Sequence, residues 1–157
     1  MEIRFIIPSE KDVIRNLFIR EWKSDVMVSR GHQHFVDKLE IIIAIQEGEI
    51  LGILTFSISE NQAEIVSLDS FSEGNGIGTK LLDFTLNQFN NLNLDRIWLI
   101  TSNDNCKAMR FYQKRGWKIV DIHLNAIEDA RKIKPEIPLL GYDEIPILHE
   151  IEFEYSL

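Results

Sequence analysis

The chain has 157 residues, of which 45% are hydrophobic and 27% are charged, and its formal net charge is -8. This size and composition predict one ordinary soluble domain over residues 1–157, with a proper hydrophobic core. The charge argues against nonspecific binding to nucleic acid, and no apolar run approaches the ~20 residues of a membrane span. A single cysteine excludes an internal disulfide, and the N-terminus starts directly as a strand, so we expect a cytoplasmic protein without a signal peptide.

The first third of the chain predicts a strand, a helix and a loop. Residues 2–7 favour a strand that Pro8 ends. Ser9 is a candidate N-cap for a helix that runs to about Trp22, because an apolar stripe recurs there with a 3.6-residue period. The periodicity fades over residues 23–37, which predicts a loop with room for a short helix.

The rest of the chain predicts a meander followed by alternating helices and strands. The expected strands are residues 40–46, 50–59, 63–70, 96–101, 117–122 and 150–155, and the expected helices are residues 77–90, 105–115 and 125–133. The last strand alternates apolar and polar residues, so pairing across a homodimer is one expectation. A loop rich in proline, residues 134–146, precedes that strand.

A glycine-rich turn, residues 72–79 (SEGNGIGT), separates a predicted strand from a predicted helix. Free backbone N–H groups and the positive end of the helix dipole make such a turn an anion site. The order Thr79-Lys80 after the last glycine does not fit a P-loop, and Leu81 stands where a dinucleotide fingerprint needs its third glycine. ATP and NAD are therefore poor candidates for this turn.

A second block, residues 105–117 (NCKAMRFYQKRGW), follows about thirty residues later. The first block resembles the Gln/Arg-x-x-Gly-x-Gly/Ala loop of the GNAT N-acetyltransferases, and the second resembles that family's Asn-x-x-Ala-x-x-Phe-Tyr-x-x-x-Gly-Phe helix. The resemblance implies an α/β (α+β) fold, with a mixed, mainly antiparallel central sheet flanked by helices. It also implies an acetyl-CoA-dependent N-acetyltransferase that acts on a small-molecule or peptide amine by direct attack in a ternary complex.

The resemblance further implies which residues contact acetyl-CoA. They are Leu68, Ser70, Gly74, Asn75, Gly76, Ile77, Gly78, Thr79, Asn105, Ala108, Phe111 and Tyr112. Backbone N–H groups of Leu68 and Ser70 would polarise the thioester carbonyl. The chain departs from the family at Glu73, where Arg or Gln is usual, and a carboxylate there disfavours a pyrophosphate unless it points to solvent. Lys80 and Lys107 are candidates to compensate that charge.

Acetyl transfer to an amine needs a base for the ammonium proton and an acid for the departing thiolate. The resemblance places Tyr112 beside the coenzyme sulfur as the acid, although an aromatic core residue is the plainer interpretation. Glu64, on the strand before the glycine turn, is the candidate base, with an exposed strand-edge carboxylate as the plainer interpretation. Asp69 is its rival, and strand alternation predicts that the two side chains lie on opposite faces.

Other residues carry weaker expectations. Cys106 follows the candidate helix cap Asn105, but no histidine is placed to partner it, so we expect an inert thiol. The histidines lack metal-ligand spacing, so no metal is expected. Residues that could line an acceptor pocket, or could simply be solvated, are Arg30, His32, His34, Glu144 and Glu150. The alternative function is a CoA-binding sensor or interaction module without catalysis.

Overall fold

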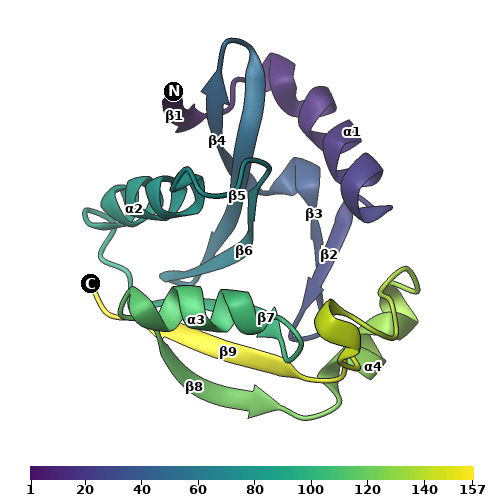
Figure 1. Cartoon of the computed structure of the whole chain (residues 1–157). Helices are drawn as coiled ribbons and strands as arrows, with labels where there is room; N and C mark the ends of the chain where they lie inside the picture. Colours follow the sequence, from purple (N-terminus) through teal and green to yellow (C-terminus); the bar gives the residue numbers. More distant parts are fainter.

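A computed structural model describes all residues from 1 to 157. Its strands are β1 (Glu2–Phe5), β2 (Val26–Ser29), β3 (His32–Phe35), β4 (Glu40–Gln46), β5 (Glu49–Ser59), β6 (Gln62–Ser70), β7 (Arg96–Ser102), β8 (Lys118–His123) and β9 (Glu150–Tyr155). Its α-helices are α1 (Lys11–Trp22), α2 (Ile77–Phe89), α3 (Cys106–Lys114) and α4 (Ala126–Ile133). Seven strands form one sheet in the order β1-β4-β5-β6-β7-β9-β8 (Figure 1). All its pairings are antiparallel except β6 with β7, which confirms the expected mixed, mainly antiparallel sheet.

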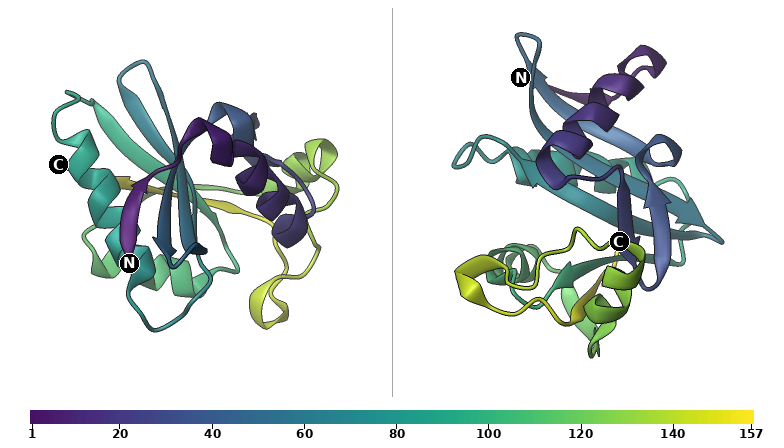
Figure 2. Two further views of the ribbon diagram at one scale, coloured as in Figure 1. Left: turned by 90° about the horizontal axis from the view of Figure 1, so that it is seen from above. Right: turned by 90° about the vertical axis from the view of Figure 1, so that its right-hand side faces the viewer.

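Helices cover both faces of this sheet, with α1 and α2 on opposite sides of the strands (Figure 2). On one face, Leu81 and Phe89 of α2 pack in a cluster with Leu54 of β5. On the other face, Ile14 and Phe18 of α1 pack in a second cluster. Strands β4 and β5 are therefore buried on both sides, which explains their nearly continuous apolar runs. None of the helices is long and apolar enough to cross a bilayer.

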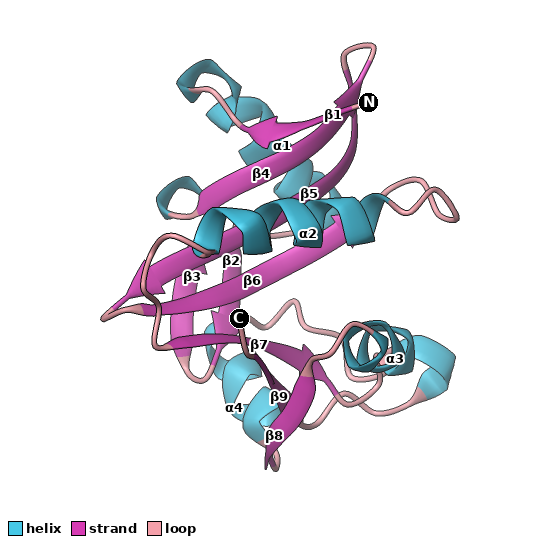
Figure 3. Cartoon of the chain, turned by 90° about the vertical axis from the view of Figure 1, so that its left-hand side faces the viewer, coloured by secondary structure: helices cyan, strands magenta, loops and turns pink.

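Strands β6 and β7 separate towards their carboxyl ends. They pair only over Gln62–Ile65 and Arg96–Leu99, although β6 continues to Ser70 and β7 to Ser102. Figure 3 shows α2 lying over the β4–β6 side of the sheet and α3 beside β7, β9 and β8. The unpaired ends of β6 and β7 leave an opening between these two halves. The strand before the glycine turn therefore splays away from its neighbour at this end.

The prediction of a loop over residues 23–37 is wrong, because most of these residues form a β-hairpin. Strands β2 and β3 pair from Val26 with Phe35 to Ser29 with His32. The two residues between them, Arg30 and Gly31, have φ values of 47° and 77°. Two successive left-handed residues match the twist of a tight hairpin turn, so Gly31 supplies the conformation that closes it.

Ser9 does not cap α1, contrary to the prediction. It lies inside a 3₁₀ turn, Pro8–Glu10, and α1 starts only at Lys11. The carboxylate of Glu10 accepts the Ile7 N–H at 2.8 Å and a bidentate pair of hydrogen bonds from Arg4 at 2.8 and 2.9 Å. Glu10 therefore fastens the end of β1 to the start of α1, and these bonds lower its pKa to about 2.

Strand β9 cannot pair across a dimer, so that expectation is also wrong. It pairs with β7 on one side and with β8 on the other, which leaves it no free edge. The last strand of the chain thus lies between two strands that precede it in the sequence. The outer edge at this end of the sheet belongs to β8, whose residues are mostly exposed.

Candidate functional site

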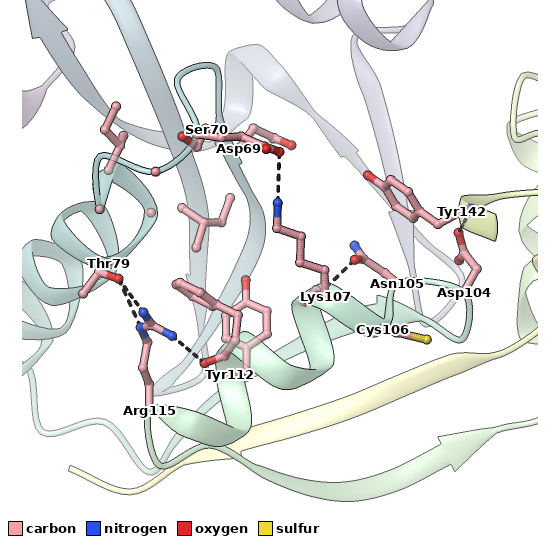
Figure 4. Close-up of a pocket in the computed structure, with 18 of the residues that line it drawn as sticks. Asp69, Ser70, Thr79, Asp104, Asn105, Cys106, Lys107, Tyr112, Arg115 and Tyr142 are labelled. Atoms are coloured by element: carbon pink, nitrogen blue, oxygen red, sulfur yellow. Dashed lines mark hydrogen bonds and ion pairs between the residues drawn. The ribbon is translucent and has the colours of Figure 1, made fainter.

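A cavity of about 670 Å³ occupies the opening at the carboxyl ends of β6 and β7 (Figure 4). Its walls come from the end of β6, the glycine turn, the start of α2, helix α3 and the loop before β9. All the residues predicted to contact the coenzyme line it except Asn75, whose side chain donates to Ser72 at 2.7 Å. The lining also includes Asp69, Glu73, Asp104, Cys106, Lys107, Arg115, Tyr142 and Asp143. The structure thus brings together two motifs that lie about thirty residues apart.

The N-terminus of α2 opens into this cavity. Gly76 occupies the N-cap position with φ 68°, and no side chain caps the first turn. Gly74 precedes it with φ 82°, another left-handed conformation that favours glycine. The first N–H groups of a helix have no partner within the helix, and the helix dipole places partial positive charge there. The turn is therefore built to hold an anion against the backbone.

Arg115 adds a positive charge that the sequence interpretation did not use. Its guanidinium donates to the Thr79 hydroxyl at 3.1 and 2.8 Å and to the Phe111 carbonyl at 3.0 Å. The same group lies 3.8 Å above the Phe111 ring. The i, i+4 spacing of Phe111 and Arg115 on the helix was the available signal for this stacked pair.

Glu73 lines the cavity and forms an ion pair with helix α3. Its carboxylate pairs with Lys107 Nζ at 2.9 Å, and both side chains are about 80% exposed (80% and 81%). A pair in that much solvent contributes little free energy, but it takes up the unfavourable charge near the turn. The ion pair drawn from Lys107 in Figure 4 is this one.

Helix α3 presents Tyr112 to the cavity. The Asn105 side chain accepts the Ala108 N–H at 3.1 Å, which confirms the predicted helix cap. Tyr112 is only 7% exposed and packs edge-on against Phe111 and Trp117. Its hydroxyl forms no hydrogen bond with the protein and lies on the cavity side (Figure 4). Burial, and secondly the negative charge of Asp69, raise the pKa of this phenol well above its usual range, so it stays protonated and able to donate.

Glu64 lies beneath the β2–β3 hairpin, on the face of the sheet opposite to α2. Ser29 donates its hydroxyl hydrogen to Glu64 Oε2 at 2.5 Å, and His34 Nε2 lies 3.4 Å from Glu64 Oε1. His34 Nε2 also lies 2.8 Å from Ser29 Oγ. Because the only hydroxyl hydrogen of Ser29 goes to the carboxylate, His34 Nε2 must carry a proton and donate it. Glu64 is thus buried and hydrogen-bonded rather than an exposed edge carboxylate.

A second buried carboxylate holds the tip of the same hairpin. Glu150 accepts the Arg30 N–H at 3.2 and 3.3 Å and is 2% exposed. Three of the residues named as candidates for the acceptor side therefore meet at this hairpin: Arg30, His34 and Glu150. His32 and Glu144 are exposed to solvent instead.

Asp69 does not lie opposite Glu64, so the prediction from strand alternation is wrong. Thr55 pairs with Ser67 while Phe56 pairs with Ile65, so Val66 is an extra residue in β6. Such a β-bulge shifts the alternation by one residue and returns Glu64 and Asp69 to the same face. That face is the one covered by α1, because Asp69 pairs with Ile53, a member of the α1 cluster.

The loop before β9 closes one end of the cavity through Asp104, which the sequence interpretation did not single out. Asp104 is 3% exposed, and its Oδ2 accepts the Tyr142 N–H at 3.1 Å. A Cβ atom at Gly141 would lie 1.9 Å from this oxygen, so only glycine fits there. The contact brings Tyr142 and Asp143 to the cavity wall.

Comparisons with solved structures agree with this architecture. A GNAT family acetyltransferase from Elizabethkingia anophelis with acetyl-CoA bound has a TM-score of 0.72 at 18% identity, covering 99% of this chain and 97% of that one. A Bacillus subtilis acetyltransferase in complex with CoA has a TM-score of 0.71 at 16% identity, covering 99% and 98%. At such identities the likeness concerns the fold.

Sequence comparisons are more specific. The protein YxbD of Bacillus subtilis is 41% identical over 150 residues, covering 93% of this chain and 94% of that protein. YdhI of the same organism is 40% identical over 152 residues, covering 94% and 95%. Both relatives are described as uncharacterized. Residues 11–117 match the model of the acetyltransferase (GNAT) family, which includes both motifs and all the elements around the cavity except the last loop. The chain therefore belongs to the GNAT acetyltransferase family.

Proposed function

We propose that this protein transfers the acetyl group of acetyl-CoA to a primary amine of a small molecule or peptide, by direct attack within a ternary complex. The observation that carries the proposal is the cavity itself, which joins an uncapped helix N-terminus to the phenol of Tyr112 across two separated strands. Solved relatives with this fold hold acetyl-CoA or CoA, which supports the choice of acyl donor.

The glycine turn and the first turn of α2 would hold the diphosphate of the coenzyme through backbone N–H groups. Arg115 would add a positive charge beside Thr79. When bound, the coenzyme supplies a thioester, whose acyl carbon is the electrophile.

The edge of β6 supplies donors for the thioester carbonyl. The Phe71 N–H donates to Leu51 on β5 at 2.8 Å. Because backbone N–H groups alternate along a strand, those of Ser70 and Leu68 point away from β5, towards the open side left by β7. Preorganised donors at this position would stabilise negative charge that develops on the carbonyl oxygen.

The proton transfers need an acid and a base near the acyl group. Tyr112 would protonate the departing sulfur, since its raised pKa keeps the phenol protonated. An aliphatic ammonium has a pKa of about 10.4 and must lose a proton before it attacks. Two carboxylates lie on the α1 side of β6 and could take that proton: the predicted base Glu64 and its rival Asp69.

The test is thiol release from acetyl-CoA with a panel of primary amines and peptides, followed by Tyr112→Phe. We expect the variant to lower kcat about 10²–10³-fold, because general acid catalysis contributes that much, while the Kd for acetyl-CoA changes little. Tyr155→Phe is the control, because Tyr155 packs against Trp117 but does not line the cavity. Coenzyme binding without thiol release against any amine would favour the binding-module alternative. Unchanged turnover in Tyr112→Phe would remove that residue from the mechanism.

A further inference from the structure

The β-bulge at Val66 gives the two carboxylates of β6 different surroundings on one face. Glu64 is 7% exposed, hydrogen-bonded to Ser29 and close to His34. Asp69 is half-buried, lines the cavity and has neither a hydrogen bond nor an ion pair to its side chain. Glu64 is thus occupied in fastening the hairpin to the sheet, whereas Asp69 is open to a ligand.

Two titratable groups act on Asp69, and the cation that lines the same cavity nearby, Lys107, is paired with Glu73 instead. From α1, Glu21 contributes a second negative charge, and from α3, Tyr112 contributes a protonated phenol. The end of α1 is placed over the end of β6 by Trp22, whose ring lies 6.3 Å from that of Phe71. No cation pairs with Asp69, so an ammonium group entering from the α1 side would meet an unpaired carboxylate next to the acid of the reaction.

We propose that Asp69 takes the proton from the acceptor ammonium, and that Glu64 is a positioning residue that anchors the β2–β3 hairpin. The proposal rests on the proposed function and assigns its base. It takes the primary amine of the proposed function to arrive in its protonated, cationic form. Burial, with the charge of Glu21 as a second cause, raises the pKa of Asp69 to about 7, so the group can both accept and release a proton near neutral pH.

The proton balance is complete without another reactant. The Asp69 carboxylate accepts one proton from R–NH₃⁺, which leaves R–NH₂, and later releases that proton to solvent. The amine nitrogen forms the N–C bond to the acyl carbon, and Tyr112 donates its proton to sulfur as the C–S bond breaks. The second proton lost from nitrogen restores the Tyr112 phenol. The net products are the acetylated amine, CoA thiol and one proton.

The kinetic test compares Asp69→Asn with Glu64→Gln, using the most reactive amine of the panel. At pH 7 we expect Asp69→Asn to lower kcat/KM about 10²–10³-fold. In this variant log(kcat/KM) should rise with pH, with unit slope, up to the pKa of the amine, because without the base only the free amine reacts. Glu64→Gln should raise the KM for the amine. Its plot of log(kcat/KM) against pH should keep the acidic limb of the parent, which is the rise on the acidic side of the plateau. The reverse pattern, with the limb lost only in Glu64→Gln, would overturn the proposal.

Glu21→Gln provides a graded perturbation. Removing this neighbouring negative charge should shift the acidic limb to lower pH and leave the rate at its plateau nearly unchanged. A limb that does not move, in a variant with parental stability, would contradict the assignment of that limb to Asp69.

Two measurements need no acceptor and separate failure of this proposal from failure of the proposed function. A ¹³C NMR titration of aspartate carboxyls, assigned with Asp69→Asn, should give a pKa near 7, and a value near 4 would overturn the proposal. Because the pKa is raised from 3.8 to about 7, ionisation of Asp69 destabilises the fold as pH rises through that window. Asp69→Asn should therefore raise Tm at pH 8 by about 2–6 °C and not at pH 4, whereas a Tm loss at both pH values would indicate a structural role.

Discussion

The two faces of the sheet around β6 are built in different ways. On the α2 face, the anion site consists of backbone groups, and the residues that form it lie within two short motifs, at residues 72–79 and 105–117. On the α1 face, the polar groups are side chains from distant parts of the chain, for example the Ser29 hydroxyl on Glu64 and the Arg30 guanidinium on Glu150. A site made of backbone groups needs glycines followed by the start of a helix, and a short stretch of sequence encodes both. A site made of side chains depends on which strands lie next to each other in the fold. We therefore expect the first face to carry what the family shares and the second to carry the choice of acceptor.

The largest expected effect tests the backbone site. Gly78→Asp places a negative charge in the first turn of α2, where the helix dipole favours an acidic residue, so the free protein should keep its stability. The same charge repels a diphosphate, and the Kd for acetyl-CoA should rise about 100-fold by isothermal titration. Gly78→Asn has the same shape without the charge and is the control. Equal losses in both variants would mean that space, not charge, sets the affinity.

A glycine in the sheet tests how α2 is seated. A Cβ atom at Gly52 would lie 2.6 Å from Ile77 Cγ2 and 3.0 Å from the Asp69 carbonyl oxygen, so α2 must shift. We expect Gly52→Ala to lower the free energy of unfolding by about 1–3 kcal/mol in urea titrations, the usual range for overpacking. Gly78→Ala is the control, because its Cβ would meet only Phe111 at 3.6 Å. Equal stability of the two variants would show that α2 adapts.

The α1 face has its own test in Ser29→Ala. This change removes the hydrogen-bond donor to buried Glu64, which should cost about 1–2 kcal/mol of stability and loosen the hairpin. The KM for the amine should rise, while the Kd for acetyl-CoA stays at the parental value. Gln33→Ala, in the same hairpin but exposed, is the control. A change in coenzyme affinity alone would contradict the division of roles between the faces.

The smallest effect concerns the junction of β1 and α1, away from both sites. The pKa of Glu10 falls from 4.5 to about 2 because of the bonds from Arg4 and Ile7. A lowered pKa contributes stability above the unfolded value, and this is lost as pH falls towards the folded value. Glu10→Gln should therefore lower stability by about 1 kcal/mol at pH 7, since the pair is partly solvated. The difference should shrink between pH 4.5 and 2, and a difference independent of pH would contradict the electrostatic cause.

Most of the fold could be predicted from periodicity, and the α2 side of the site from its motifs. The glycine turn, the cap at Asn105 and the position of Tyr112 depend on neighbours within one turn or one helix, so the local sequence determines them. The stacking of Arg115 on Phe111, four residues before it in the same helix, could have been predicted in the same way but was missed.

The α1 side could not be predicted because its geometry depends on strand register. The extra residue at Val66 shows only as a change of parity in the apolar positions of β6, from Ile65 to Leu68, which the sequence interpretation did not use. It nevertheless moves Asp69 to the face of Glu64. The β2–β3 hairpin lacks a long apolar pattern, and only Arg30-Gly31 marked its turn. The place of β9 between β7 and β8 depends on the whole sheet and on no local feature.

The most direct test of the central claim is thermal unfolding with and without acetyl-CoA, with ATP and NAD as controls. A ligand at a hundred times its Kd adds about 2.7 kcal/mol to stability, which for a chain of this size raises Tm by roughly 5–10 °C. We predict this rise with acetyl-CoA alone, and its loss in Gly78→Asp. No rise at millimolar acetyl-CoA, or an equal rise with ATP or NAD, would contradict the assignment of the cavity to the coenzyme.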